Sequence, residues 1–224
     1  AVELGELEAL GARGEVRRGL GDPNGSVADF SRALARSSKD SALWNGRGHS
    51  YLAQKNYDLA AKDFETANRL APREAKYLGS LGKAYYDKGD LKKSANYYAK
   101  ALEKDQQDPK LWSARGEALL SMGRPGVDRA IKDFDMAIEL SPKDAELYQH
   151  RGLAYYVKGM GIDAVHDYNK AIELNPGRAE PYKLRAAIWL KERKFKQARD
   201  DYERAIKRAP RDAEALLKQA QVHM

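Results

Sequence analysis

The chain of 224 residues contains no cysteine, which excludes disulfide bridges and thiolate metal sites. Its 40 Lys and Arg residues outnumber its 33 Asp and Glu residues, and the formal net charge of +7 would permit binding to nucleic acid or to an anionic surface. It has neither an apolar run of membrane-spanning length nor a signal-peptide core, which leaves the compartment open and slightly favours the cytoplasm.

The same residue types return along the chain every 34 residues, apart from one step of 36. One slot in the first half of each copy holds Gly14, Gly48, Gly82, Gly116, Gly152 and Ala186. An aromatic slot in the second half holds Phe30, Phe64, Tyr98, Phe134, Tyr168 and Tyr202, with a small residue four positions before it and an Ala three positions after it. Spacings of four and three place these residues on one face of a helix. A repeat of this length predicts a solenoid in which each copy is a pair of helices.

In chain order, a single array over residues 1–224 is expected to contain repeats at approximately 7–40, 41–74, 75–108, 109–144, 145–178 and 179–212, with a capping helix at 213–224. The first copy is rich in glycine and is expected to be either an N-terminal cap or the damaged edge of a longer array, with Ser26 as the N-cap of its second helix. The fourth copy has two extra residues within 122–126, which we expect to lengthen the turn between its helices. The sixth copy has a basic run at 191–199 in its turn, and Leu216 and Ala220 of the capping helix are expected to cover its apolar face.

Two slots of the repeat change together. The residue before the glycine slot and the residue before the aromatic slot are an Arg and an Asp in five copies: Arg13 and Asp29, Arg47 and Asp63, Arg115 and Asp133, Arg151 and Asp167, Arg185 and Asp201. In the third copy both are lost, to Leu81 and Tyr97. We therefore expect partly buried salt bridges in five repeats and an apolar contact in the third, because one buried partner left alone is costly. Independent surface charges are the competing interpretation.

This set of slots resembles the tetratricopeptide repeat family, in a variant with Arg before the Gly, as in Arg47-Gly48, Arg115-Gly116 and Arg151-Gly152. The resemblance covers roughly residues 7–224. It implies an all-α fold, a right-handed superhelical solenoid of antiparallel helix pairs. It also implies a concave face lined by the first helix of each pair, where the family binds partner proteins.

We accordingly expect a non-catalytic scaffold that binds a partner peptide or helix in its concave groove, with no cofactor and no metal. His49 and His150 are too far apart to share a metal, and no phosphate loop or nucleophile–base set is present. Nucleic-acid or anionic-surface binding through a basic convex face, or a regulatory role in a larger enzyme, are the alternatives. The sequence does not specify the partner or the oligomeric state. Candidate groove residues are Asn45, His49, Lys76, Ser80, Lys83, Tyr86, Lys110, Ser113, Glu117, Glu146, Gln149, His150, Leu153, Tyr156, Glu180, Lys183 and Leu184.

The charges of these candidates suggest a polarity along the groove. Lys76, Lys83 and Lys110 would make it basic over the second to fourth repeats, whereas Glu146 and Glu180 would make it acidic further on. A Lys near a helix N-terminus is opposed by the helix dipole, so Lys76 and Lys110 need a reason, although chance arrangement competes with this hypothesis.

The same surface is expected to carry an apolar row. Tyr86 and Tyr156 would point toward the groove, in the slot that holds Leu52, Leu120 and Leu190 in other copies, unless they pack in the core. The family's clamp for a C-terminal carboxylate is not expected, because only Asn45 and Lys110 match its residue types in the best window.

Overall fold

The structure, a computed structural model, describes residues 2–222, without the side chains of residues 2–5, 217 and 220–222. Within this range it contains thirteen helices and no strand, which confirms the predicted all-α fold. The helices are α1 (Val2–Gly19), α2 (Pro23–Arg36), α3 (Ser41–Ala53), α4 (Tyr57–Leu70), α5 (Ala75–Lys88), α6 (Leu91–Leu102), α7 (Pro109–Ser121), α8 (Arg124–Leu140), α9 (Ala145–Lys158), α10 (Gly161–Leu174), α11 (Glu180–Lys191), α12 (Phe195–Arg208) and α13 (Ala213–Val222).

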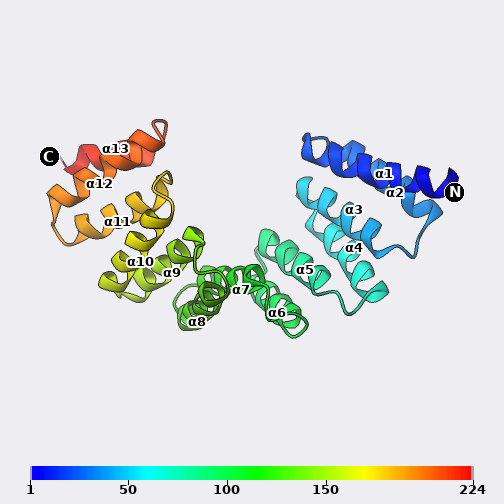
Figure 1. Ribbon diagram of the computed structural model, residues 1–224, viewed down its shortest axis with the longest axis horizontal. Helices are drawn as coiled ribbons and strands as arrows, with labels where there is room; N and C mark the ends of the chain where they lie inside the picture. Colours follow the sequence, from blue (N-terminus) through cyan, green and yellow to red (C-terminus); the bar gives the residue numbers. More distant parts are fainter. Residues whose placement is uncertain (1, 223–224) are drawn as a thin grey trace. The chain divides into compact units, whose positions relative to one another are not determined.

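The chain divides into two compact units between Ala118 and Leu119, within α7. In the first unit α1 packs against α2, α3 against α4 and α5 against α6 (Figure 1). Helix α2 also packs against α3, and α4 packs against α5. First helices of adjacent repeats also touch, because α3 contacts both α1 and α5. In the second unit α9 pairs with α10 and α11 with α12, while α8 packs on α9 and α13 packs on α12. Each unit is therefore a stack of helical hairpins.

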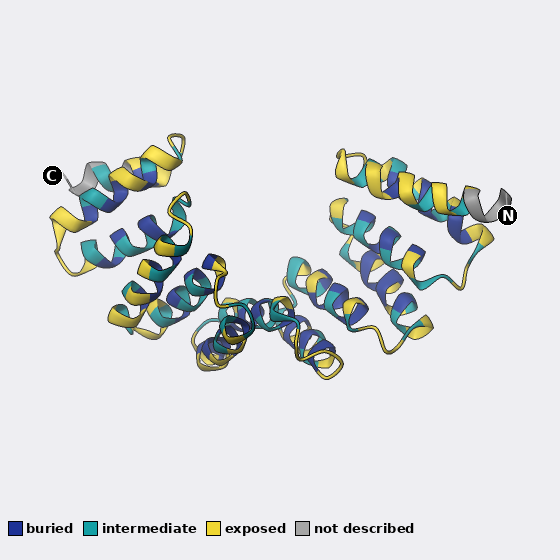
Figure 2. Cartoon of the chain, in the orientation of Figure 1, coloured by how far each residue is buried: buried dark blue, intermediate teal, exposed yellow. Residues whose placement is uncertain are grey.

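The glycine slot exists because an aromatic ring occupies the space of a side chain. A Cβ atom at Gly48 would lie 2.6 Å from Cε1 of Phe64, and one at Gly152 would lie 2.7 Å from Cε1 of Tyr168. These rings are fully buried, with exposed fractions of 0% and 1%. Figure 2 shows the same pattern in each unit, with buried residues between packed helices and exposed residues at the turns. The glycine lets the two helices of a pair approach until the ring fills the gap between them.

The first turn of α2 differs from the prediction. Its N-cap is Asp22, whose carboxylate accepts a hydrogen bond from the amide of Gly25 at 2.8 Å. Ser26 is buried inside the helix and donates its hydroxyl to the carbonyl oxygen of Gly14 at 2.7 Å. The expectation that Ser26 caps this helix is wrong, because Pro23 fits the first turn and lets α2 begin earlier.

The two extra residues of the fourth repeat lie in a helix and not in a turn. Residues 122–123 connect α7 to α8, as few as the residues 159–160 that connect α9 to α10. Helix α8 instead has 17 residues where α10 has 14. A Cβ at Gly126 would lie 1.9 Å from the carbonyl oxygen of Leu119, so this glycine allows the longer α8 to start against α7. The expected lengthening of the turn is therefore wrong.

The C-terminal helix covers the sixth repeat with a different residue than predicted. Ala215 is completely buried and packs with Ala186, Ala198 and Tyr202. Leu216 is 44% exposed, so its expected role in covering this face is wrong. The side chain of Ala220 lies outside the described residues.

Candidate functional site

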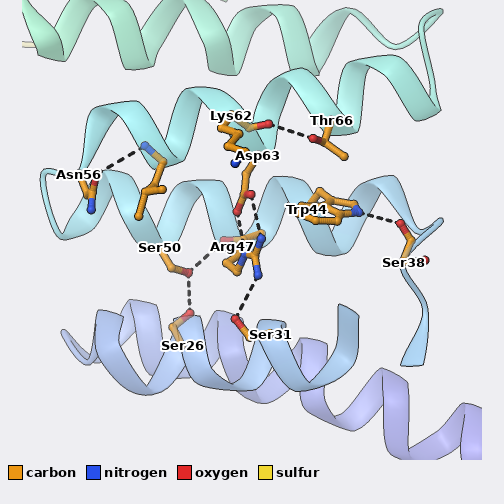
Figure 3. A network of polar contacts seen from close by, with 12 residues as sticks. Ser26, Ser31, Ser38, Trp44, Arg47, Ser50, Asn56, Lys62, Asp63 and Thr66 are labelled. Atoms are coloured by element: carbon orange, nitrogen blue, oxygen red, sulfur yellow. Dashed lines mark hydrogen bonds and ion pairs between the residues drawn. The ribbon is translucent and has the colours of Figure 1, made fainter. Parts of the chain in front are cut away.

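Arg–Asp pairs fix the first helix of a repeat to two other helices. Arg47 donates from Nε to Oδ2 of Asp63 at 2.7 Å and from Nη2 to Oδ1 at 2.9 Å, and its Nη1 donates to the hydroxyl of Ser31 at 3.2 Å (Figure 3). Asp63 lies on α4 of the same repeat, whereas Ser31 lies on α2 of the preceding one. The guanidinium therefore joins both helices of its own pair to the previous pair.

The same bidentate geometry recurs in both units. Equivalent double hydrogen bonds of 2.6–2.8 Å join Arg13 to Asp29, Arg151 to Asp167 and Arg185 to Asp201. The hydrogen bond from Arg13 lowers the pKa of the Asp29 carboxyl, whose side chain is fully buried. The expected pair of Arg115 and Asp133 stays a prediction. These clamps hold α1, α3, α9 and α11 against the second helices of their repeats.

The third repeat replaces the ion pair with apolar and aromatic contacts. Leu81 is 1% exposed and belongs to the same hydrophobic cluster against which Tyr97 packs. The Tyr97 ring stacks on Tyr85 with centroids 5.2 Å apart and an interplanar angle of 5°. The ammonium groups of Lys93 and Lys100 cover the Tyr85 and Tyr97 rings at 5.1 and 5.2 Å.

The sequence prediction missed an unusual polar residue beside this cluster. Asn68 stands where the other copies have Leu34, Leu102, Ile138, Ile172 and Ile206. Its Oδ1 is buried and has no hydrogen-bond partner among the described residues. Asn68, Leu81 and Tyr97 line a cavity of 520 Å³. Comparison of slots between copies would have identified Asn68 as the exception.

On the first helices of the first unit, a polar cluster joins α3 to α5. The hydroxyl of Ser80 lies 3.1 Å from Oδ1 of Asn45 and 3.4 Å from Nε2 of His49. His49 packs edge-on against Phe64 at 5.0 Å, and burial lowers its pKa, which favours the neutral ring. Ser80 is buried, so Asn45 and His49 are the half-buried members of this cluster that meet the surface.

The lysines expected at the basic end are exposed. Lys76 lies 3.2 Å from a carboxylate oxygen of Glu74, and Lys83 lies 2.5 Å from one of Asp87. Glu74 is the N-cap residue of α5 and makes no capping hydrogen bond, so it offsets the unfavourable dipole at Lys76. Lys110 is exposed near the start of α7. The hydroxyl of Ser113 is directed to Glu117 at 3.3 Å, and Ser113 itself is buried.

In the second unit the corresponding helices carry acidic groups. Glu146 lies 3.2 Å from Arg178, and the ammonium of Lys183 lies 3.0 Å from both Glu180 and Asp212 and 3.3 Å from Glu214. Burial disfavours the charged Lys183, but its hydrogen bonds to Asp212 and Glu180 outweigh this and raise its pKa. One ammonium among three carboxylates leaves the surface around Lys183 negative.

The remaining candidates in this unit differ in exposure. Tyr156 is 36% exposed, and Leu153 and Leu184 are half-buried. Gln149 is buried, and His150 packs against Phe134 at 5.8 Å. Tyr86, in the first unit, is also half-buried, so neither tyrosine of the expected apolar row is confined to the core.

Other kinds of site receive no support from the described part of the chain. It contains no cluster of three or more His, Asp or Glu residues able to hold a metal ion. None of its helices is long and apolar enough to span a membrane. The basic run at 191–199 is exposed from Lys191 to Gln197.

Comparison with known proteins relates these repeats to one family. The profile of the tetratricopeptide repeat matches residues 12–75, 46–110, 80–145 and 188–224. Tetratricopeptide repeat protein 37 of Xenopus laevis is 28% identical over 134 residues, a match that covers 55% of this chain and only 9% of that protein. The fold is similar to that in the crystal structure of the APC/C hetero-tetramer Cut9-Hcn1, with a TM-score of 0.78 and 19% identity over 97% of this chain and 42% of that one. It is also similar to YrrB, described as a tetratricopeptide repeat protein with an unusual peptide-binding site, with a TM-score of 0.66 and 19% identity over 85% of this chain and 97% of that one.

Proposed function

The chain belongs to the tetratricopeptide repeat family, and we propose that it is a non-catalytic scaffold that binds a segment of a partner protein along the first helices of its repeats. Proteins of this family act as protein–protein interaction scaffolds. The finer assignment, binding on the first helices, rests on the residues that those helices present at the surface.

The main support is the surface of α3 and α5. Asn45, Lys76 and Lys83 lie there without a role in the hydrophobic core, and Asn45 can hydrogen-bond a peptide backbone while the lysines attract carboxylates. The ion pairs of Lys76 with Glu74 and of Lys83 with Asp87 are exposed, so they are weak and can be exchanged for pairs with a partner. The Arg47–Asp63 clamp holds α3 in place, and the apolar cluster around Leu81 holds α5. Binding would therefore cost little to order this surface.

The proposal includes a direction for the bound segment. Its acidic part would lie on the first unit, near Lys76, Lys83 and Lys110. A basic or apolar part would lie on the second unit, near Glu180, Glu214 and Leu184, because like charges placed opposite each other are unfavourable.

Nucleic-acid binding through the second helices is the competing function, and local pairing of their charges weakens it. Lys93 of α6 lies 3.3 Å from Asp90, and Lys170 of α10 lies 2.8 Å from Glu173. Paired lysines release few counterions when a polyanion binds.

A charge-reversal experiment tests the proposal. After cross-linking identifies the partner in the native source, its affinity is measured for a Lys76→Glu/Lys110→Glu variant at low and moderate salt. We expect affinity to fall by about tenfold or more and the salt dependence to weaken. The matched control is Lys62→Glu/Lys92→Glu, which makes the same charge change at exposed positions on α4 and α6. Equal losses in both variants would contradict binding on the first helices.

A further inference from the structure

The turn between α9 and α10 departs from the corresponding turns of the first three repeats in three successive residues. The N-cap position of the second helix is held by Asp22, Asn56 and Asp90 in three other repeats, and each accepts a backbone hydrogen bond there. Met160 occupies it here and makes no capping bond. The next position holds Tyr57, Leu91 and Phe195 in other copies, but Gly161 here. Ile162 follows and is 84% exposed.

A cavity occupies the space beside Gly161. It measures 450 Å³, and its lining includes the apolar side chains of Tyr156, Met160, Ile162 and Ile188. A Cβ at Gly161 would lie 3.8 Å from Cγ2 of Ile188 and 3.8 Å from Oε1 of Glu192, which are ordinary contacts. The site therefore has room for a large side chain that this repeat lacks and that Tyr57 and Leu91 supply in theirs.

These three residues lower the stability of the fold, and no contact within the described part of the chain compensates for the loss. An apolar N-cap forfeits the capping hydrogen bond, and glycine at the start of a helix restricts the chain less than the apolar residues found there in other copies. An exposed isoleucine beside an open apolar cavity adds surface that water solvates poorly. Local sequence rules are typically broken at functional sites, where another gain compensates.

A basic run in the sequence begins at the edge of this cavity. Lys191 lines it, with its ammonium 5.6 Å from the centroid of the Tyr156 ring. Arg193 and Lys196 are exposed and have no carboxylate within 4.0 Å among the described residues. Within the described residues, Lys194 does form an ion pair, with Glu192 at 2.7 Å. The positive charges of the run thus outnumber the negative charges of the nearby Glu192 and Asp163. The net charge is positive and would attract a negatively charged partner.

We propose that this surface, the Gly161 cavity together with the basic run at 191–199, binds a partner segment that inserts one large aliphatic side chain into the cavity and places acidic residues against Arg193 and Lys196. A nucleic acid matches the charge but has no large aliphatic side chain to fill a cavity between Met160, Ile162 and Ile188. The proposal requires a protein partner, but it does not require that the partner lies on the first helices.

The direct probe is a pair of synthetic peptides with blocked ends, DEELDED and DEEADED, titrated into the chain while its amide NMR spectrum is recorded. We expect the leucine peptide to bind at least about tenfold more tightly than the alanine peptide, since burying a leucine side chain is worth roughly one to two orders of magnitude in affinity. Shifts should centre on Gly161, Ile162 and Lys196. Equal binding of both peptides, or no binding at millimolar concentration, would overturn the proposal.

Two variants separate the cavity from the charge. Gly161→Leu copies Leu91, fills the cavity and should remove the preference for the leucine peptide while the fold is retained. Gly19→Leu is the matched control, because a Cβ at Gly19 meets no atom within 4 Å. Arg193→Glu/Lys196→Glu should weaken both peptides and reduce their salt dependence. If a single-stranded oligothymidylate binds the chain and loses affinity only in this charge variant, while the peptides do not bind, the surface is a nucleic-acid site and the proposal fails.

Discussion

Asn68 and Leu81 line the same cavity in the first unit, and each has the opposite polarity to its counterparts in the other repeats. Asn68 replaces a Leu or Ile, and its Oδ1 is buried without a hydrogen-bond partner among the described residues. Leu81 replaces the Arg of the ion pair and is almost fully buried. An unsatisfied hydrogen-bond acceptor next to an apolar cluster lowers stability. Replacing Asn68 by the apolar residue of the other copies should therefore stabilise the second and third repeats.

We predict that Asn68→Leu raises the free energy of unfolding by about 1–3 kcal/mol, because it removes the unsatisfied amide and fills apolar space. Urea denaturation followed by circular dichroism measures this change. The reverse substitution at the equivalent buried position, Leu34→Asn, should be destabilising. If Asn68→Leu instead lowers the free energy of unfolding, the side-chain amide of Asn68 makes a stabilising hydrogen bond and the prediction is wrong.

The Arg47–Asp63 pair is predicted to be strongly coupled. Arg47→Leu leaves the carboxylate of Asp63, which is 5% exposed, without its main partner, and should cost about 3–5 kcal/mol. The double variant Arg47→Leu/Asp63→Tyr copies Leu81 and Tyr97 of the third repeat and should recover much of that loss, since Tyr51 stands where Tyr85 stacks on Tyr97. A double-mutant cycle in urea gives the coupling energy. Additive single effects would mean that the two slots change together by chance.

The glycine slot predicts opposite effects for one substitution at two sites. Gly48→Ala places a Cβ against the Phe64 ring and should destabilise the chain by about 1–3 kcal/mol through overpacking. Gly19→Ala meets no atom and should instead stabilise α1 by up to about 1 kcal/mol. Thermal unfolding of both variants checks this. The natural Ala186 shows that the slot accepts a methyl group in the sixth repeat, so a neutral Gly48→Ala would mean that the Phe64 ring can move aside.

His49 should make stability depend on pH in the acid range. Burial lowers its pKa in the folded state, so the unfolded chain binds a proton more readily near the ordinary value of 6.5. The stability from the neutral ring is therefore present above pH 6.5 and is lost as the pH falls toward the folded-state pKa. Urea midpoints at pH 7.5, 6 and 5 should decline less in His49→Gln than in wild type, whereas His166→Gln, at an 83% exposed side chain, should behave like wild type. Parallel declines in all three proteins would contradict this role of His49.

The repeating slots made much of the fold predictable, because each copy solves the same packing problem. The Gly and aromatic slots indicated a helix pair. In the structure the aromatic ring of the second helix packs against the glycine backbone of the first helix. The joint loss of Arg and Asp at Leu81 and Tyr97 likewise predicted an apolar contact in the third repeat, and four of the expected ion pairs have the bidentate geometry of a partly buried bridge.

The errors lie where a local feature competes with the repeat. Asp22 and Pro23 start α2 before Ser26, and Gly126 lets α8 absorb two residues that were assigned to a turn. Ala215 rather than Leu216 meets the last repeat, a shift of one position that changes the face of a helix. Exceptions such as Asn68 and Gly161 are visible in the sequence, but their consequence depends on a cavity that only packed helices define.

The most direct test of scaffold function is to locate the partner on the chain by site-specific photo-cross-linking. Benzoylphenylalanine is placed at residue 83, on the exposed face of α5, and in a second protein at residue 62, on the exposed face of α4. After the partner has been identified from the native source, both proteins are mixed with it, irradiated, and analysed by mass spectrometry. The proposed function predicts cross-links from residue 83 to an acidic segment of the partner and few from residue 62. Cross-links from residue 62 alone would place the partner on the second helices and contradict it.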